Sequence, residues 1–375
     1  MKIVTIVGAR PQFIKAAAVS RVIRGFNKKK DRIREILVHT GQHYDYLMDK
    51  VFFEELELPK PDYHLGVGSG SHGRQTGIML ERIDSVMQRE KPKVAIVYGD
   101  TNSTLAGALA AAKLRIPVAH VEAGLRSYNS AMPEEINRLL ADHLSTLLFC
   151  PTDQAVRNLS KEGIKDGGTR TVRNVGDVMY DSILYYSQVA EKKSAILKNL
   201  GFDTGHGTRD TSYYLATLHR AENTDNPKRL KSIFGALNKI GKKTPVILPL
   251  HPRTKKIMEM HHLFSEFKNI RFIKPVSYLN MLKLEKRAKA ILTDSGGIQK
   301  EAYWLRVPCF TLRNETEWVE TIKNGWNVLV GTSAERIIKG VSQMEGRRGY
   351  LKGNKIFGDG MACEKIVQNL TKYFG

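Results

Sequence analysis

The sequence predicts an α/β protein built from two Rossmann-like, doubly wound domains that face a cleft, and three observations support that fold class. Short apolar runs alternate with helical periodicity along the chain, as in parallel sheets with helices on both faces. With 375 residues, the chain is too long for one typical core. Polar motifs follow the predicted strands and are scarce within them, as expected where the carboxyl ends of strands line a cleft.

Two series of predicted strands define the two domains. The first series comprises residues 3–7, 35–39, 94–98, 117–121 and 147–150, with helices predicted over 11–23 and 101–113. The second series comprises residues 213–217, 246–249, 270–273, 290–293 and 309–312. A boundary near residues 172–177 gives an N-terminal domain over 1–172 and a C-terminal domain over 173–353.

Composition narrows the class of protein. With 42% hydrophobic and 26% charged residues, the chain is expected to be globular, and it has no apolar run of about 18 residues that would span a membrane. The N-terminus looks like a first strand rather than a signal peptide, so a cytoplasmic location is expected. Cys150, Cys309 and Cys363 are far apart and form no CxxC pair, which argues against disulfides and a metal site.

A formal charge of +21 raises the hypothesis of nucleic-acid binding. However, the basic residues are spread along the chain, and we find no zinc-finger spacing and no RNA-recognition aromatic signature. A solvated basic surface that helps to attract an anionic small substrate is the preferred interpretation, with neither nucleic acid nor membrane as a partner.

The stretch TDSGGIQKEA, residues 293–302, reads as a buried strand that runs into a helix start. Unpaired N–H groups and the helix dipole at such a start suit a phosphate. Gly296 and Gly297 would let the backbone turn tightly and a diphosphate approach closely, and Ser295 adds a hydroxyl at the cap. Glu301, one turn further, could accept hydrogen bonds from ribose hydroxyls. The alternative is an ordinary strand-to-helix turn.

Charged residues follow the first, third and fourth strands of the N-terminal half. Arg10 and Lys15 could meet a diphosphate or form a structural ion pair. Asp100 and Glu122 stand at strand tips, where neighbouring carboxylates can raise one another's pKa as general acid and base pairs require. Alternatively, Asp100 caps the helix over 101–113.

The motif MPEEINR, residues 132–138, predicts a helix start with Glu134 and Glu135 in its first turn. Glu134 and Arg138 lie four residues apart and could pair. The leucines that follow at helical spacing predict that one face of this helix packs inward.

In the second half, His219 and Arg220 follow a strand, and His251 follows the next one. A histidine at the carboxyl end of a strand beside an arginine is a ligand candidate, whereas a structural role is the alternative for both histidines. Gly68, Gly70 and Gly73 match the GxGxxG spacing, but no clear strand precedes them, so we interpret this segment as a loop and not as a dinucleotide site.

Taken together, VGARPQFIK, HTGQH, YGDTNST, HVEAGLRS, MPEEINR, TLHRAEN, LPLHPRT and TDSGGIQKEA resemble the non-hydrolysing UDP-N-acetylglucosamine 2-epimerase family over nearly the whole chain. The resemblance implies a glycosyltransferase-B-like fold, with residues 354–375 as a C-terminal helix on the N-terminal domain, and a homodimer. It also implies interconversion of UDP-N-acetylglucosamine and UDP-N-acetylmannosamine for cell-surface polysaccharide precursors, without a cofactor. In some members the region of HTGQH, Arg74 and Gln75 binds a second, activating UDP-sugar.

The resemblance also implies roles for individual residues. The residues that match the family's active site are Arg10, Lys15, Asp100, Glu122, Glu134 and His219, and those that match its UDP site are Ser295, Gly296, Gly297 and Glu301. We expect the three carboxylates to transfer protons at C2 in the N-terminal domain, and Arg10 and His219 to stabilise the departing diphosphate. His251 remains a substrate-binding candidate. UDP binding is assigned to the C-terminal domain.

Some positions depart from the family pattern. The first loop reads GARPQF, Trp318 stands where an arginine is common, and Val276 replaces a residue that is often polar. These features look more like the subgroup that epimerises UDP-2,3-diacetamido-2,3-dideoxyglucuronate, which is the alternative substrate. A hydrolysing epimerase and a glycosyltransferase of the same fold are further alternatives.

Overall fold

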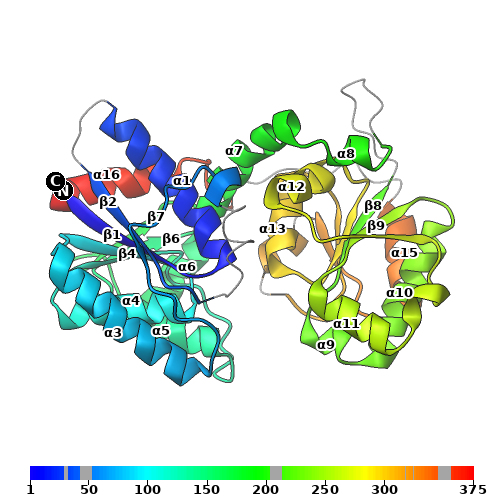
Figure 1. Ribbon diagram of the computed structural model, residues 1–375, viewed down its shortest axis with the longest axis horizontal. Helices are drawn as coiled ribbons and strands as arrows, with labels where there is room; N and C mark the ends of the chain where they lie inside the picture. The colour runs from blue at the N-terminus through cyan, green and yellow to red at the C-terminus, as the bar shows by residue number, and fades with distance from the viewer. Residues whose placement is uncertain (29–32, 43–52, 203–212, 317, 324, 345–355) are drawn as a thin grey trace. The chain divides into compact units, whose positions relative to one another are not determined.

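The computed structural model describes residues 1–28, 33–42, 53–202, 213–316, 318–323, 325–344 and 356–375. The chain divides into two compact units, of which unit 1 contains Met1–Leu184 with Lys355–Gly375 and unit 2 contains Tyr185–Asn354. Each unit is a parallel sheet covered by helices on both faces, so the predicted Rossmann-like class is confirmed for both (Figure 1).

Within the described residues, the sheet of unit 1 has seven parallel strands in the order β3-β2-β1-β4-β5-β6-β7. The strands are β1 (Lys2–Val7), β2 (Arg34–His39), β3 (Tyr63–His64), β4 (Val94–Tyr98), β5 (Val118–Val121), β6 (Leu147–Cys150) and β7 (Thr171–Asn174). The central strands are buried on both faces, which explains their continuous Val, Ile and Ala runs. The strand order reverses between β1 and β4, which makes this the topological switch point of unit 1.

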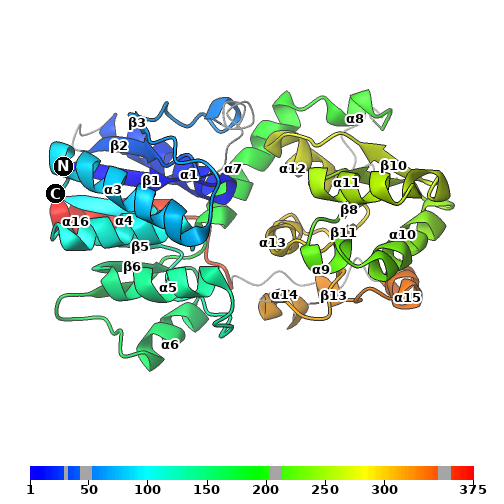
Figure 2. The same cartoon turned by 60° about the horizontal axis from the view of Figure 1, so that its bottom comes forward.

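Helices cover both faces of the unit 1 sheet (Figures 1 and 2). One face carries α3 (His72–Glu90), α4 (Asn102–Lys113) and α5 (Pro133–Leu144), whose apolar residues form one core with β1, β2 and β4. The other face carries α1 (Arg10–Asn27) and the C-terminal helix α16 (Ala362–Phe374), which contact each other. Helix α6 (Asp153–Lys161) packs beside β6 and β7.

Within the described residues, the sheet of unit 2 has six parallel strands in the order β10-β9-β8-β11-β12-β13. They are β8 (Tyr214–Thr217), β9 (Val246–Pro249), β10 (Ile270–Ile273), β11 (Ile291–Thr293), β12 (Cys309–Thr311) and β13 (Asn327–Leu329). Helices α10 (Pro227–Gly241), α11 (Pro252–Met260) and α15 (Ala334–Met344) pack on one face, and α12 (Tyr278–Arg287) and α13 (Gly296–Trp304) lie on the other (Figure 1). The order reverses between β8 and β11.

Among the described residues, three strands were not predicted: β3, β7 and β13. Each is short and lies at an edge of its sheet, where little apolar surface is buried, so the hydrophobic signal is weak. The expected boundary after residue 172 lies inside β7, which is the last strand of unit 1. The division instead falls between Leu184 and Tyr185, within the helix α7 (Val178–Lys193).

Helix α5 buries only part of the face that was predicted to pack inward. Ile136 and Leu140 are 48% and 45% exposed, whereas Asn137 and Asp142 are buried. The prediction of an inward leucine face is therefore wrong for Leu140, whereas Leu144 packs against the apolar core of unit 1. The rest of the buried side of α5 lies against polar groups at the ends of β4 and β5. Leucine spacing alone does not reveal a polar interior.

The GxGxxG segment follows β3 and leads into α3, so a two-residue strand does precede it. Because β3 is an edge strand rather than the strand at the switch point, this location does not match the first βα turn at which a dinucleotide fingerprint acts. His43 and residue 354, which belong to expected motifs, lie outside the described residues. Among the described helices, none is both long enough and apolar enough to cross a membrane.

Candidate active site

Asp100, which follows β4, is held by two residues of helix α5. Its Oδ2 lies 2.6 Å from Arg138 Nη2, and its main-chain carbonyl accepts a hydrogen bond from Asn137 Nδ2 at 2.9 Å. Arg138 also lies 2.7 Å from Glu135, so one guanidinium joins two carboxylates. These contacts fix the Asp100 side chain in place. Because 30% of its surface is exposed, the carboxylate remains accessible to a ligand.

Glu122, which follows β5, forms an ion pair with Lys15 of α1, and both side chains are largely buried. The backbone of Glu122 is left-handed, with a φ of 74°, which is uncommon for a residue that has a side chain. Gly99 lies beside this pair: its φ is 62°, and a Cβ atom there would come within 3.2 Å of Glu122 Oε2 and Lys15 Nζ. Both the conformation and the close approach favour glycine at this position.

Each of these two carboxylates therefore contacts a cation from a different helix. For Lys15, this contact is the ion pair that was the alternative to diphosphate binding. The suggested helix cap is wrong for Asp100, because Thr101 is the N-cap of α4 and its hydroxyl accepts a main-chain N–H of the first turn. Arg10, the first residue of α1, is exposed.

Glu134 and Glu135 at the start of α5 differ in burial. Glu135 is 3% exposed and accepts hydrogen bonds from the main-chain N–H groups of Ser127 and Tyr128, at 2.9 and 3.0 Å. Burial acts to raise the pKa of Glu135, but these hydrogen bonds and Arg138 outweigh it and hold the pKa below its ordinary value. Glu134 is half-buried. The suggested pair of Glu134 with Arg138 is wrong, since Arg138 pairs with Glu135.

Gln12 is a buried site residue that the sequence analysis did not single out. Its Oε1 accepts hydrogen bonds from the N–H groups of Gly8 and Ala9, at 2.8 and 3.1 Å, and its Nε2 donates to the Tyr98 carbonyl at 2.9 Å. Gln12 thereby ties the turn after β1 to the end of β4 at the switch point. The signal that the sequence offered was the place of Gln12 in the motif VGARPQF. A side-chain amide that is buried there needs hydrogen-bond partners.

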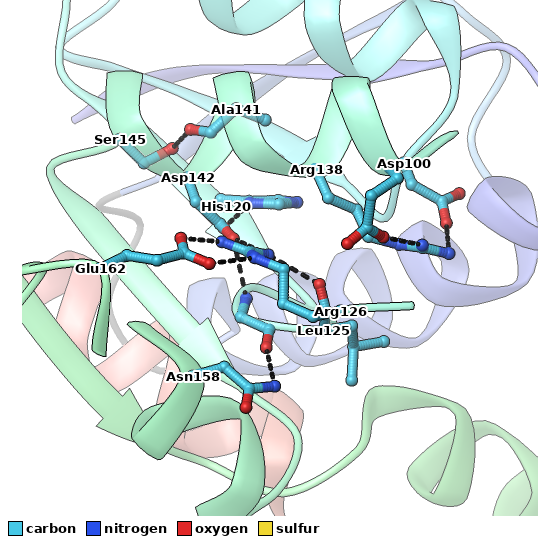
Figure 3. A network of polar contacts seen from close by, with 12 residues as sticks. Asp100, His120, Leu125, Arg126, Arg138, Ala141, Asp142, Ser145, Asn158 and Glu162 are labelled. Atoms are coloured by element: carbon cyan, nitrogen blue, oxygen red, sulfur yellow. Dashed lines mark hydrogen bonds and ion pairs between the residues drawn. The ribbon is translucent and has the colours of Figure 1, made fainter. Parts of the chain in front are cut away.

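A buried ionic network surrounds Asp142, as Figure 3 shows. His120 of β5 lies with Nδ1 2.7 Å from Asp142 Oδ1 and Nε2 2.8 Å from the Gly99 carbonyl oxygen. Arg126 contacts Asp142 at 2.7 Å and forms two hydrogen bonds with Glu162, both of 2.7 Å. The side chains of His120, Asp142 and Arg126 are at most 1% exposed. Sequence reasoning missed this network because its members are distant along the chain.

In unit 2, the predicted anion site has the expected local structure. Ser295 is the N-cap of α13, and its hydroxyl accepts the N–H of Ile298. Gly296 and Gly297 are the first two residues of the helix and do not form the tight turn that we expected. Their contribution is instead the absence of side chains at the helix start. A Cβ atom on Gly297 would meet only Ser295 Oγ, at 3.8 Å, which leaves open space at this helix start.

His219 follows β8 and is oriented by Asp294, which follows the neighbouring strand β11. Asp294 is fully buried and accepts hydrogen bonds from the main-chain N–H groups of His219 and Arg220, at 3.1 and 2.9 Å. Its Oδ1 also lies 3.4 Å from His219 Nδ1. The ring of His251, which follows β9, is 5.4 Å from that of His219. His251 Nδ1 also accepts the N–H of Arg253 as the cap of α11, so His251 has a structural role.

Further along α13, Glu301 is buried, with 8% of its surface exposed. Lys300 is also buried, and its Nζ lies 4.0 Å from the ring centre of Trp318, the residue that departs from the family pattern. The indole therefore covers a cation, an arrangement stabilised by the negative face of the ring.

The predicted residues thus lie on segments that follow neighbouring strands, which are β1, β4 and β5 in unit 1 and β8, β9 and β11 in unit 2. In unit 1 these are Arg10, Lys15, Asp100, Glu122 and Glu134, and in unit 2 they are His219, His251, Ser295, Gly296, Gly297 and Glu301. In the parts of the chain that the structure describes, no group of three or more His, Cys, Asp or Glu side chains is arranged to hold a metal ion.

Comparison with known proteins identifies a family for this arrangement. The family model described as UDP-N-acetylglucosamine 2-epimerase matches residues 27–371. A UDP-N-acetylglucosamine 2-epimerase homolog from Methanococcus maripaludis is 53% identical over 99% of both chains. The UDP-2,3-diacetamido-2,3-dideoxy-D-glucuronate 2-epimerase of Pseudomonas aeruginosa is 49% identical over 99% of this chain and 100% of the relative.

A solved structure extends the likeness to three dimensions. The crystal structure of Methanocaldococcus jannaschii UDP-GlcNAc 2-epimerase, in complex with UDP-GlcNAc and UDP, aligns with a TM-score of 0.85 and 45% identity. The alignment covers 99% of this chain and 100% of that one. The resemblance that the motifs indicated is confirmed: the chain belongs to the UDP-N-acetylglucosamine 2-epimerase family.

Proposed function

We infer that this protein is a non-hydrolysing UDP-N-acetylglucosamine 2-epimerase, an isomerase that interconverts UDP-N-acetylglucosamine and UDP-N-acetylmannosamine. The observation that carries this inference is the geometry of Asp100 and Glu122. The two carboxylates follow adjacent parallel strands, and each is fixed by a cation from a different helix. Family membership supplies the sugar nucleotide as the substrate class.

The chemistry follows from the substrate. The hydrogen on C2 of a UDP-2-acetamido sugar is not next to a carbonyl, so a base cannot simply remove it. Loss of the C2 proton together with cleavage of the C1–O bond releases UDP and leaves a 2-acetamidoglucal. Return of a proton to the opposite face of C2 and attack of the UDP oxygen on C1 give the epimer. The proton and the UDP both return, so no oxidant is consumed.

Unit 1 carries the residues for the proton transfers. Asp100, Glu122 and the half-buried Glu134 are the proposed acid and base groups at C2. Lys15 holds Glu122 in place, and the exposed Arg10 is proposed to stabilise the developing charge on the diphosphate. The buried bonds of Gln12 fix the turn that presents Arg10.

Unit 2 carries the residues for UDP. The N–H groups at the start of α13, next to Gly296 and Gly297, suit a diphosphate, and Glu301 is proposed to accept hydrogen bonds from ribose hydroxyls. His219, which Asp294 orients, is proposed to neutralise charge on the leaving diphosphate. His251 is proposed as a further contact with the substrate.

A second substrate is supported by a specific observation. The Pseudomonas aeruginosa relative that bears the name of a diacetamido-glucuronate epimerase is nearly as similar as the first relative. Trp318, which lies over Lys300, also departs from the pattern of the parent family. The same elimination and re-addition would then act on UDP-2,3-diacetamido-2,3-dideoxyglucuronate.

Location and assembly complete the proposal. The three cysteines are free and buried, as expected for a reducing compartment, which supports a cytoplasmic enzyme.

Exposed Ile136 and Leu140 on α5 support a homodimer in which such an apolar face is covered. Sedimentation of the purified protein tests this: a monomer at micromolar concentration would contradict the dimer.

Incubation with each UDP-sugar in deuterated water tests the function. An epimerase will place solvent deuterium at C2 and yield both epimers, whereas a hydrolysing enzyme will accumulate UDP and free sugar. A glycosyltransferase will show no turnover without an acceptor. Absence of deuterium from C2 of both candidate substrates would contradict the inference.

A further inference from the structure

We propose that His120, buried as an imidazolium cation that donates from both ring nitrogens, is a positioning residue that fixes Asp100 and Glu122 for proton transfer. This inference rests on the proposed function. His120 lies on β5, two residues before Glu122, and its ring contacts the carbonyl of Gly99, the residue before Asp100. One side chain thus connects the backbone segments that carry both carboxylates.

The charge of His120 follows from its two partners. Nδ1 lies 2.7 Å from a carboxylate oxygen of Asp142, and Nε2 lies 2.8 Å from the carbonyl oxygen of Gly99. A carbonyl oxygen and an ionised carboxylate accept hydrogen bonds and do not donate them. Both ring nitrogens must therefore carry hydrogen, which is the imidazolium form.

Asp142 is ionised because of what surrounds it. Besides His120, it accepts the main-chain N–H of Gly124 at 3.1 Å and contacts Arg126 at 2.7 Å. Arg126 is permanently charged, so its contact with Asp142 favours the ionised carboxylate whatever the state of the imidazole ring. With Glu162 bound to Arg126, the network contains two cations and two anions, so its charges balance.

The contact with Gly99 matters because the position of that peptide is tightly constrained. Gly99 has a left-handed backbone and lies close to the ion pair of Glu122 and Lys15. The next residue, Asp100, is held by Asn137 and Arg138. Without the His120 donor, the buried Gly99 carbonyl would lose a charge-assisted hydrogen bond, and the peptide would be free to shift.

A purely structural role for His120 predicts a different outcome. In that case, removal of the ring would lower stability and every activity together, including UDP binding. A positioning role predicts that kcat falls while KM and UDP affinity stay near their wild-type values, since a shift of about 1 Å in a reacting group can cost about 100-fold in rate.

Two substitutions of His120 test the proposal. His120→Phe removes both donors and keeps a planar ring, and His120→Gln keeps one amide donor of similar reach. We expect His120→Phe to lower kcat by about 100-fold, and His120→Gln to recover part of that loss. The matched control is His261→Gln at the exposed C-terminal end of α11, which should behave as wild type. Thermal unfolding and UDP affinity are measured for all variants.

Nitrogen NMR of histidine-labelled protein tests the charge without any turnover. The His120 signals are identified by their absence from the His120→Gln spectrum. We expect both ring nitrogens to be of the protonated type at neutral pH. One unprotonated ring nitrogen would overturn the imidazolium.

The activity data have equally clear contrary outcomes. A wild-type kcat in His120→Phe would overturn the positioning role. The role would also be overturned if UDP affinity, stability and activity all fell together in both variants. If the wild-type protein turns over no UDP-sugar, the proposed function fails and the positioning role falls with it, whereas the NMR result still stands as a property of the fold.

Discussion

The carboxyl edges of the two sheets are built differently. In unit 1, the side chains at the strand ends are held by ion pairs and buried polar groups that come from α1, α5 and the neighbouring strand. In unit 2, the strand ends lead to the start of α13 and to His219, which keeps 34% of its side chain exposed. Ion pairs between side chains therefore fix the carboxyl edge of the unit 1 sheet. At the carboxyl edge of the unit 2 sheet, backbone N–H groups are the main polar groups.

This difference fits the two tasks that we propose. Proton transfer needs side chains fixed at defined distances, and that requires interactions which over-determine their positions. A diphosphate needs donors and a positive field, which a helix start supplies without any particular side chain. Unit 1 should therefore be sensitive to the loss of single charges, and unit 2 should tolerate the loss of a single hydroxyl.

The largest effect is expected at Asp100. Asp100→Asn keeps the shape of the side chain but removes a proton acceptor, so epimerisation should fall by about 100- to 10,000-fold while the protein stays folded. Deuterium incorporation at C2 measures the rate, and circular dichroism checks folding. Asp153→Asn, at an exposed carboxylate in unit 1, is the control. Near-normal turnover would remove Asp100 from the mechanism.

The next largest effect is expected on stability at Asp142. Asp142→Asn leaves the buried cations His120 and Arg126 with a neutral partner, and breaking a buried pair in this way costs about 3–5 kcal/mol. Urea unfolding should show this loss. Asp166→Asn breaks an exposed pair with Arg173 and should cost far less. Equal stabilities for the two variants would mean that burial of the network contributes nothing.

A smaller effect is expected at Ser295. Ser295→Ala removes the hydroxyl that caps α13, and a cap contributes about 0.5–1.5 kcal/mol, so UDP affinity should weaken by about 2- to 10-fold. Calorimetric titration with UDP measures this change. Ser277→Ala provides a matched control, because Ser277 is the N-cap of α12 but makes no side-chain cap hydrogen bond. An unchanged UDP affinity in Ser295→Ala would contradict the proposed anchor.

The smallest effect concerns Glu191 of α7, which contacts Lys283, Lys286 and Arg287 of α12. Burial opposes its ionisation, but hydrogen bonds from Arg287 and Lys283 outweigh burial and lower the pKa of Glu191 from 4.5 to about 2. Because the folded pKa is the lower one, this stabilisation is present above pH 4.5 and disappears as the pH falls towards 2.

Glu191→Gln should therefore reduce the free energy of unfolding by about 1–2 kcal/mol at neutral pH. Urea titrations of both proteins should show that the difference shrinks as the pH approaches 2. The control is Glu266→Gln, which breaks an exposed pair with Lys231 and should change little. A difference that is independent of pH would show that the charge of Glu191 does not carry the effect.

The sequence predicted the central strands well and the edges poorly. The runs at β4, β6 and β9 were predicted at their observed bounds, because a strand buried on both faces is a continuous apolar run. The edge strand β10 is an exception, since its bounds were also predicted although only Ile270 is buried. At β3, β7 and β13, neighbours in the fold supply the pairing that the local sequence does not signal.

The candidate site was also predicted only in part: the sequence indicated the residues at the strand ends but not their partners. Motifs directly after strands pointed to Asp100, Glu122, His219 and Ser295, because the carboxyl end of a parallel strand is read from the sequence once the strand is recognised. The partners of these residues, such as Arg138 and Asp294, could not be assigned, since pairing depends on distances across the fold.

By itself, the sequence determined the α/β class, the two sheets and the residues that stand at their carboxyl edges, because hydrophobic periodicity and turn chemistry are local properties. Only the tertiary structure decided that Lys15 binds Glu122, that α5 buries a polar face, and that His120 lies between Asp142 and Gly99. Ion pairs and buried hydrogen bonds join residues far apart in the chain, and their strength depends on burial, which exists only after folding.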